Sequence, residues 1–182
     1  SALAFQEGYF SSLIFIIILI TALLIQIGTN FTNDLFDYIS GADNNDRLGP
    51  DRALQKGLFS KSEIEKAIFF IFTLAIIFGF YLALIGDWPI VIIGILSILF
   101  GFLYTAGPYP LAYNGLGDLF VFIFFGLVSV SGTYYLHTGK FCIESIILGA
   151  AVGSISTAIL VINNLRDIDN DKKYGKKTLA VL

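Results

Sequence analysis

Methionine is absent from the 182 residues, and cysteine, histidine and tryptophan occur once each. The lone Cys142 excludes a disulfide framework and a thiol-based metal site within this chain. We interpret the lone His137, at the end of an apolar segment, as an interfacial side chain rather than a metal ligand or a base. Because the sequence starts at Ser1 and has no methionine, we expect it to be a piece of a longer protein, with sequence missing before Ser1 and after Leu182.

Charged residues are also scarce, at 14% of the chain against 56% hydrophobic residues. This balance argues against an ordinary water-soluble domain and favours a membrane protein. Its apolar segments approach the roughly 20 residues that a helix needs to cross a bilayer. They lack the alternation of strands, so we predict an all-α, multi-span bundle. Because no basic residues precede the first segment and no small-residue cleavage site follows it, we do not expect it to be a cleaved signal peptide. We expect a single transmembrane domain over residues 1–182, with spans at about Tyr9–Ile27, Ala67–Ile85, Trp88–Tyr104, Leu119–Leu136 and Phe141–Ile162.

Basic residues gather in two polar segments that these spans place on the same side of the membrane. Of the eleven Lys and Arg residues, only Lys140 falls on the other side. The positive-inside rule then puts the basic side in the cytoplasm. The ten residues of the basic side are Arg47, Arg52, Lys56, Lys61, Lys66, Arg166, Lys172, Lys173, Lys176 and Lys177.

Two local patterns predict details of the bundle. Ser60–Glu63 has the capping-box form that starts a helix, and we expect it to begin the second span. Gly149–Gly153, with the sequence GAAVG, is a small-xxx-small pattern that lets two membrane helices approach closely.

Acidic and amide side chains follow the first and the last expected span. If the first helix continues, Asn30, Asn33, Asp34 and Asp37 share one face, because residues three and four apart are neighbours on a helix. Asn164, Asp167 and Asp171 repeat this spacing after the last span, and Asp43 follows in the first loop. Such residues can simply be solvated, but carboxylates at a helix C-terminus oppose the helix dipole. Two such groups on one side of the membrane indicate a function.

Oxygen ligands without histidine or cysteine suit a hard cation such as Mg²⁺, which proteins typically hold with one or two carboxylates and the phosphates of a substrate. The neighbouring basic side chains suit phosphate oxygens. The two groups together predict a site for a metal-bound diphosphate above an apolar bundle that can hold a hydrocarbon tail. The basic residues concerned are Arg47, Arg52, Arg166, Lys172 and Lys173.

These motifs resemble those of the UbiA superfamily of intramembrane aromatic prenyltransferases, which have the forms NDxxDxxxD and DxxDxxxD. The first reads NDLFDYISGAD here, so Asn33, Asp34 and Asp37 match, and Gly41 stands in place of the last aspartate. The second reads NLRDIDND, in which Asp167 and Asp171 match and Asn164 replaces the leading aspartate.

These departures from the family motifs resemble one branch of the family, the 1,4-dihydroxy-2-naphthoate polyprenyltransferases. Four longer segments are similar to the same branch: QIGTNFTNDLFDYISGAD, DRLGPDRALQKG, YNGLGDLFVFIFFGLVSVSGTYYL and INNLRDIDNDKKYGKKTLAV. Family members have about nine spans, so the resemblance implies a five-span fragment of a transmembrane prenyltransferase domain. It implies an enzyme of the bacterial inner membrane with its motifs on the cytoplasmic side. The implied reaction is Mg²⁺-dependent transfer from a polyprenyl diphosphate to 1,4-dihydroxy-2-naphthoate, with decarboxylation to a demethylmenaquinone. Nucleic acid is not an expected partner.

The resemblance also implies roles for individual residues. The expected catalytic residues are Asn33, Asp34, Asp37, Asp167 and Asp171, with the four aspartates as metal ligands. Expected substrate-binding residues are Asn30, Asp43, Arg47, Arg52, Asn164, Arg166, Lys172 and Asp118. Arg52 and Arg166 are candidates for the carboxylate of the acceptor or for diphosphate. Asp118 is a candidate for a ring hydroxyl or a solvated residue at a helix start.

Other functions remain open at this point. A related enzyme would prenylate 4-hydroxybenzoate or homogentisate. A fragment of a cation transporter would place its carboxylates near the middle of the membrane. A membrane-embedded interaction protein would need no paired acidic motifs.

Overall fold

The computed structural model describes residues 1–42 and 52–182, and within these ranges it contains helices and no strand. The predicted all-α, multi-span class is confirmed. The helices are α1 (Ala2–Gln6), α2 (Ser12–Ser40), α3 (Lys61–Leu103), η1 (Leu111–Tyr113), α4 (Gly117–Val121), η2 (Phe122–Val128), α5 (Ser129–Thr138), α6 (Ile143–Arg166) and α7 (Ile168–Lys173). η1 is a single 3₁₀ turn and η2 is a π-helical stretch.

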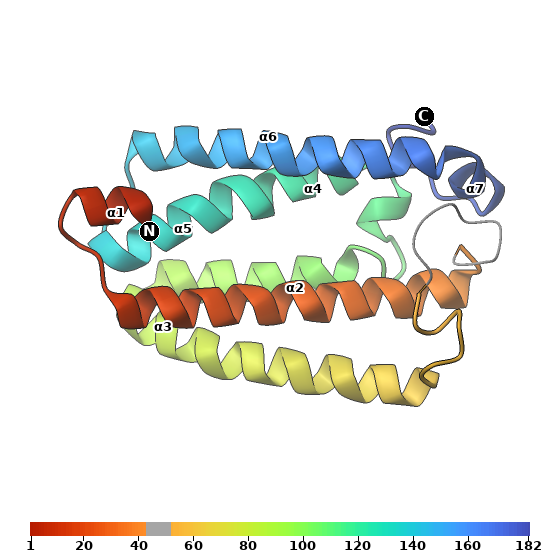
Figure 1. Cartoon of the computed structure of the whole chain (residues 1–182), viewed down its shortest axis with the longest axis horizontal. Helices are drawn as coiled ribbons and strands as arrows, with labels where there is room; N and C mark the ends of the chain where they lie inside the picture. The colour runs from red at the N-terminus through yellow and green to blue at the C-terminus, as the bar shows by residue number, and fades with distance from the viewer. Residues whose placement is uncertain (43–51) are drawn as a thin grey trace.

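Four helices of the described ranges are long and apolar enough to cross a membrane: α2, α3, α6 and the continuous helix Gly117–Thr138, which joins α4, η2 and α5. They lie side by side (Figure 1). Many large apolar side chains, such as Phe69, Leu84 and Ile147, are exposed. A large exposed apolar surface is unfavourable in water and favourable in lipid.

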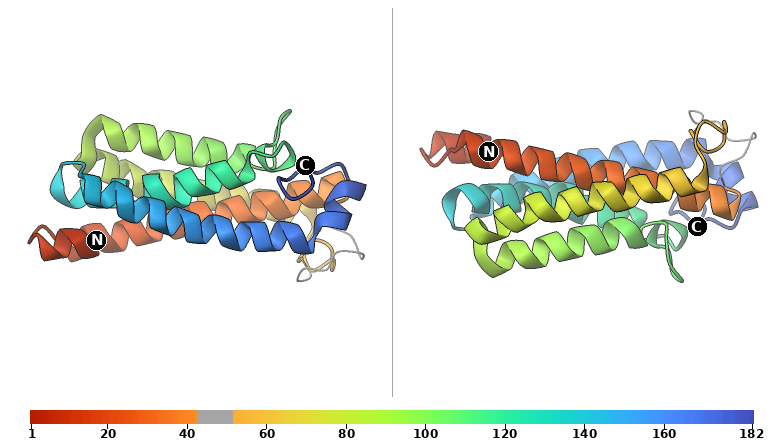
Figure 2. Two further views of the ribbon diagram at one scale, coloured as in Figure 1. Left: turned by 90° about the horizontal axis from the view of Figure 1, so that it is seen from above. Right: turned by 90° about the horizontal axis from the view of Figure 1, so that it is seen from below.

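α3 consists of two arms. Its 43 residues would extend over roughly 65 Å as one straight helix, about twice the apolar thickness of a bilayer. The chain reverses at Asp87, whose φ of 52° and ψ of −157° are not helical, and Pro89 follows in the first turn of the second arm. The two arms run in opposite directions beside each other (Figures 1 and 2). The reversal lies between the second and third expected spans.

The two local predictions about the bundle are confirmed. Ser60 caps α3: its hydroxyl accepts a hydrogen bond from the backbone N–H of Glu63, while the Glu63 carboxylate accepts one from the backbone N–H of Ser60. Gly149 and Gly153 bring α6 against η2, where a Cβ on Gly126 would lie 2.5 Å from the Cα of Gly153. Glycine is required on both sides of this contact.

At the end of the bundle with the α5–α6 turn, His137 lies against the N-terminal segment. Its ring nitrogens contact the hydroxyl of Ser1 at 3.1 Å and the backbone nitrogen of Ser11 at 3.4 Å. The ring also stacks on Phe10. His137 is therefore a buried structural residue far from the acidic motifs, which lie at the opposite end of the helices.

Candidate active site

The two acidic motifs meet at one end of the bundle. The last turns of α2 carry the first motif, and the α6–α7 junction carries the second, at the same end in Figures 1 and 2. α2 continues as a helix to Ser40, so its acidic and amide residues keep the expected helical spacing. α6 ends at Arg166 and α7 begins at Ile168, so Asp167 lies in a break between two helices.

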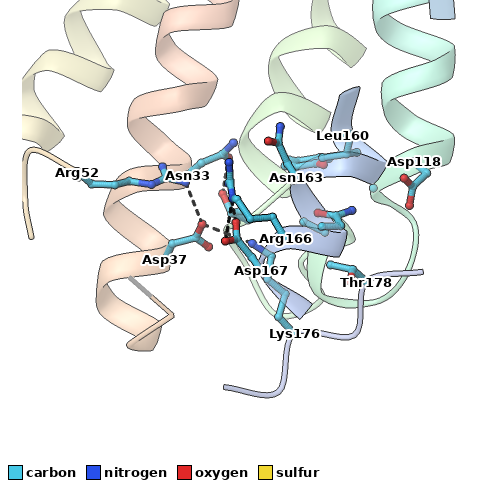
Figure 3. A pocket seen from close by; sticks show the side chains of 15 residues that line it. Asn33, Asp37, Arg52, Asp118, Leu160, Asn163, Arg166, Asp167, Lys176 and Thr178 are labelled. Atoms are coloured by element: carbon cyan, nitrogen blue, oxygen red, sulfur yellow. Dashed lines mark hydrogen bonds and ion pairs between the residues drawn. The ribbon is translucent and has the colours of Figure 1, made fainter. Parts of the chain in front are cut away.

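A pocket of about 370 Å³ opens between the two motifs (Figure 3). It is also lined by the loop that leads from α3 to α4 and by the chain that follows α7. Of the residues predicted for the site, those that line the pocket are Asn33, Asp37, Arg52, Asp118, Asn164, Arg166 and Asp167.

Asp37 is buried beside the pocket and has partners from three segments of the chain. The hydroxyl of Tyr113 donates to its Oδ1 at 2.8 Å. The Nζ atom of Lys176 and the Nη2 atom of Arg52 lie 3.5 Å and 3.7 Å from its Oδ2. Because Asp37 is only 3% exposed, these donors offset the cost of burying its charge.

Arg52 joins the two motifs electrostatically. Its guanidinium forms an ion pair with Asp34 and a second with Asp37. Burial lowers the pKa of Arg52, and the negative charge of Asp167 opposes this shift. One arginine from the first loop is thus within electrostatic reach of both acidic motifs.

Asp167 is held by its neighbour in the sequence. The Nε and Nη2 atoms of Arg166 donate to the two carboxylate oxygens of Asp167, at 3.1 Å and 2.8 Å. This forked contact fixes the carboxylate at the helix break and orients the guanidinium, and both side chains line the pocket.

Amide side chains complete the wall of the pocket. Asn33 accepts a hydrogen bond from the hydroxyl of Thr105 at 2.6 Å, which ties α2 to the end of α3. Asn163 and Asn164 line the opposite side from α6.

Four predicted residues within the described ranges do not line the pocket. Asp34 forms an ion pair with Arg52, Asp171 is buried at 5% exposure, and Asn30 and Lys172 are exposed. Asp43 and Arg47 lie outside the residues that the structure describes.

Several pocket residues were not among the predicted ones. Lys176 and Thr178 reach the pocket because the chain after α7 turns back, where the backbone N–H of Lys177 donates to the carbonyl of Tyr113 at 3.0 Å. Lys176 belongs to the second basic segment, so its charge could have marked it as a phosphate-binding residue. Tyr104 and Thr105 have no motif that marks them, and only the fold brings them to the site.

The donor set fits a divalent cation that is shared with phosphate. Within residues 1–42 and 52–182, no three His, Cys, Asp or Glu side chains form a group that could hold a metal alone. Asp37 and Asp167 nevertheless line one pocket with three asparagine amides. One or two carboxylates completed by phosphate oxygens are what Mg²⁺ commonly uses.

The whole chain matches the profile of one known protein family. The profile of the UbiA prenyltransferase family matches residues 1–182. The chain is 40% identical over 187 residues to a 1,4-dihydroxy-2-naphthoate octaprenyltransferase of Escherichia coli, which covers 100% of the chain and 61% of that protein. Proteins of the same name from Haemophilus influenzae and Bacillus subtilis are 41% and 36% identical, over 94% and 93% of the chain and 58% and 55% of their own lengths. No solved structure matches the chain.

The chain therefore spans just over half the length of these curated relatives. The profile covers every residue, including both acidic motifs and the pocket between them. On this evidence the chain belongs to the UbiA prenyltransferase family.

Proposed function

We propose that the complete protein transfers a polyprenyl group from a polyprenyl diphosphate to 1,4-dihydroxy-2-naphthoate, in the synthesis of menaquinone. The observation that carries the proposal is the single pocket that joins Asp37 and Asp167 with Arg52, Arg166 and Lys176. The names of the relatives in Escherichia coli, Haemophilus influenzae and Bacillus subtilis support the choice of acceptor.

The diphosphate would lie against the basic side chains. Arg166 presents a planar guanidinium that can form two parallel hydrogen bonds with phosphate oxygens, and Lys176 supplies a point charge. Asp37 and Asp167, together with Asp34 and Asp171 of the same two motifs, would hold Mg²⁺ at this site. When bound, Mg²⁺ draws off negative charge from the departing diphosphate.

The reaction breaks the bond between the allylic carbon and the diphosphate oxygen, and the diphosphate leaves with the electron pair. Arg52, Arg166 and Lys176 stabilise the charge that develops on this oxygen. The electron-rich ring attacks the allylic carbon. Carbon dioxide leaves from the same ring position and returns its bonding electrons to the ring.

The membrane supplies the second half of the substrate site. The pocket is lined by the ends of α2 and α6, which lie at one end of the bundle (Figure 1), so a diphosphate bound there can extend its hydrocarbon tail along the apolar helices. The basic residues at this end support a pocket on the cytoplasmic side, and the bacterial relatives support the inner membrane of a bacterium.

The test is an assay of the full-length protein with one polyprenyl diphosphate, Mg²⁺ and a panel of 4-hydroxybenzoate, homogentisate and 1,4-dihydroxy-2-naphthoate. We expect prenylated product and released carbon dioxide with the naphthoate alone. Preferred turnover of 4-hydroxybenzoate would contradict the proposed acceptor and keep the diphosphate site. No prenyl transfer to any ring would contradict the reaction itself.

A further inference from the structure

One wall of the pocket carries the residues proposed for diphosphate and Mg²⁺, and a second wall is not used by that site. Asp118, near the start of α4, and Thr178, in the chain after α7, both line it. Figure 3 places these two side chains on the side of the pocket away from Asp37 and Arg52. They are almost fully buried, at 6% and 4% exposure.

Both side chains have a polar atom without a partner. Asp118 Oδ1 and Thr178 Oγ1 are buried and form no hydrogen bond with any described residue. Leaving a buried polar atom unpaired costs at least as much as a hydrogen bond contributes, so native proteins rarely leave two on one cavity. Their common position on the pocket indicates that a bound molecule supplies the missing partners.

The charge of this wall selects the kind of molecule. Within the described chain, no lysine or arginine forms an ion pair with Asp118, whereas Arg52, Arg166 and Lys176 all contact aspartates of the two motifs. An unpaired carboxylate repels a diphosphate and accepts a hydrogen bond from a neutral donor. This wall therefore suits a neutral donor such as a hydroxyl group rather than a phosphate.

Tyr104 also lines the pocket, next to Gly117 at the start of α4. A tyrosine hydroxyl is protonated at neutral pH, so Tyr104 can donate a hydrogen bond into the pocket. Gly117 leaves the space for it, since a Cβ there would lie 2.9 Å from the Tyr104 hydroxyl oxygen.

We propose that Asp118 and Thr178 bind the aromatic acceptor by its ring oxygens. Asp118 accepts a hydrogen bond from a ring hydroxyl, and Thr178 forms a hydrogen bond with a second oxygen on the ring. This inference rests on the proposed prenyl transfer and deepens it. It assigns the wall with Asp37 and Arg52 to the diphosphate and the wall with Asp118 and Thr178 to the aromatic acceptor. The ligand class is a hydroxylated aromatic ring, held by one carboxylate and one alcohol.

The test compares two ligands in the full-length protein, namely the dihydroxynaphthoate and the same compound with its hydroxyls methylated. Equilibrium binding is measured for the wild type, Asp118→Asn and Thr178→Val, and binding of the polyprenyl diphosphate with Mg²⁺ is measured separately. We expect each variant to raise the acceptor Kd by about tenfold. We expect the diphosphate Kd to stay within about twofold, because these side chains lie on the other wall.

Methylation provides the decisive comparison. It should weaken binding about tenfold in the wild type and less than about twofold in Asp118→Asn, because the hydrogen bond is already weakened there. Equal losses in both proteins would overturn the inference, as would a parallel rise in the diphosphate Kd. Asp87→Asn at the α3 reversal and Thr73→Val on an exposed face of α3 serve as matched controls and should bind both ligands as the wild type does.

The outcomes separate the subsite from the reaction. The full-length protein could bind the dihydroxynaphthoate, with a higher Kd in Asp118→Asn and Thr178→Val, and yet transfer no prenyl group. That result would support the acceptor subsite and contradict the proposed function. Transfer to the naphthoate with the same acceptor Kd in the wild type and both variants would overturn the subsite and leave the reaction in place.

Discussion

Asp37 contacts Arg52, Tyr113 and Lys176, which come from three separate segments of the described chain. Asp167 instead has a forked contact with its neighbour Arg166. The two carboxylates are thus positioned by different means, one by tertiary contacts and one by local geometry. Both line the pocket, so each is expected to affect the same chemical step.

Replacing either carboxylate with its amide keeps the shape and removes the charge. We expect Asp37→Asn and Asp167→Asn to lower turnover of the full-length enzyme by about two orders of magnitude or more, because charge stabilisation at the leaving group is lost. Asp34→Asn and Asp171→Asn test the outer carboxylates in the same assay. Asp87→Asn and Glu144→Gln, at the other end of the bundle, should retain wild-type rates. Wild-type turnover in both Asp37→Asn and Asp167→Asn would contradict the assignment.

Tyr113 is the least expected of the residues that hold Asp37. Its hydroxyl donates to Asp37 and contacts the hydroxyl of Ser40 at 2.7 Å. Tyr113→Phe removes about 1 kcal/mol of hydrogen bonding and should raise the KM for polyprenyl diphosphate by roughly fivefold. Tyr109→Phe in the same loop is the matched control, because Tyr109 is 60% exposed and does not line the pocket. Equal KM values in the two variants would show that Asp37 does not need this contact.

At the scale of elements, the contact between α6 and η2 holds the second motif in place. Gly126 packs directly on Gly149 and Gly153, so the backbones touch without side chains between them. In a bilayer, where lipid is as apolar as leucine, such close packing is a main source of attraction between helices. The pocket residues of the second motif, among them Asn163, Arg166 and Asp167, lie at the end of the same helix α6.

One added methyl group should distinguish this contact from an open helix face. A Cβ at Gly126 would meet the carbonyl oxygen of Gly149 at 2.5 Å, whereas a Cβ at Gly94 would meet nothing within 4 Å. We expect Gly126→Ala to cost about 1–3 kcal/mol through overpacking, seen as a lower Tm in detergent. Gly94→Ala should leave the Tm unchanged or raise it, because alanine favours helix by up to about 1 kcal/mol. A Gly126→Ala variant as stable as Gly94→Ala would contradict the close contact.

At the scale of the whole molecule, the described part of the chain has two distinct ends. The ends of α2 and α6, which carry the acidic motifs, lie at one end, and the turn between α5 and α6 lies at the other (Figure 1). Arg52 and Lys176 pair with Asp37 of the first motif, whereas Lys140, in the α5–α6 turn, contacts Glu7. Because both acidic motifs lie at one end among basic residues, the arrangement favours a site for an anionic substrate over an ion path through the middle of the membrane.

This polarity predicts the accessibility of three exposed positions, Ser62, Lys140 and Lys172. In a full-length protein without other reactive thiols and with Cys142→Ser, single cysteines at Ser62 and Lys172 should react with an impermeant reagent from the cytoplasmic side only. A cysteine at Lys140 should react only from the opposite side. Serine suits position 142 because Cys142 caps the N-terminus of α6. Labelling of positions 62 and 140 from the same side would contradict the topology.

The sequence by itself determined the helical class, the membrane setting, the start of α3 at Ser60 and the close contact at Gly149 and Gly153. These features follow from length, apolar composition and short-range spacing, which are local properties of the chain. The spacing of Asn33 and Asp37 on one helix face is local in the same sense.

Only the tertiary structure decided which polar residues share the pocket. Tyr113 reaches Asp37 from 76 residues away, and Thr178 enters because the chain after α7 folds back on the loop before α4. No periodicity encodes such contacts, because they depend on how whole helices pack. Asp171 in α7 is buried outside the pocket, and Asp118 Oδ1 is buried without a hydrogen-bond partner among the described residues. Both outcomes depend on packing and not on local spacing.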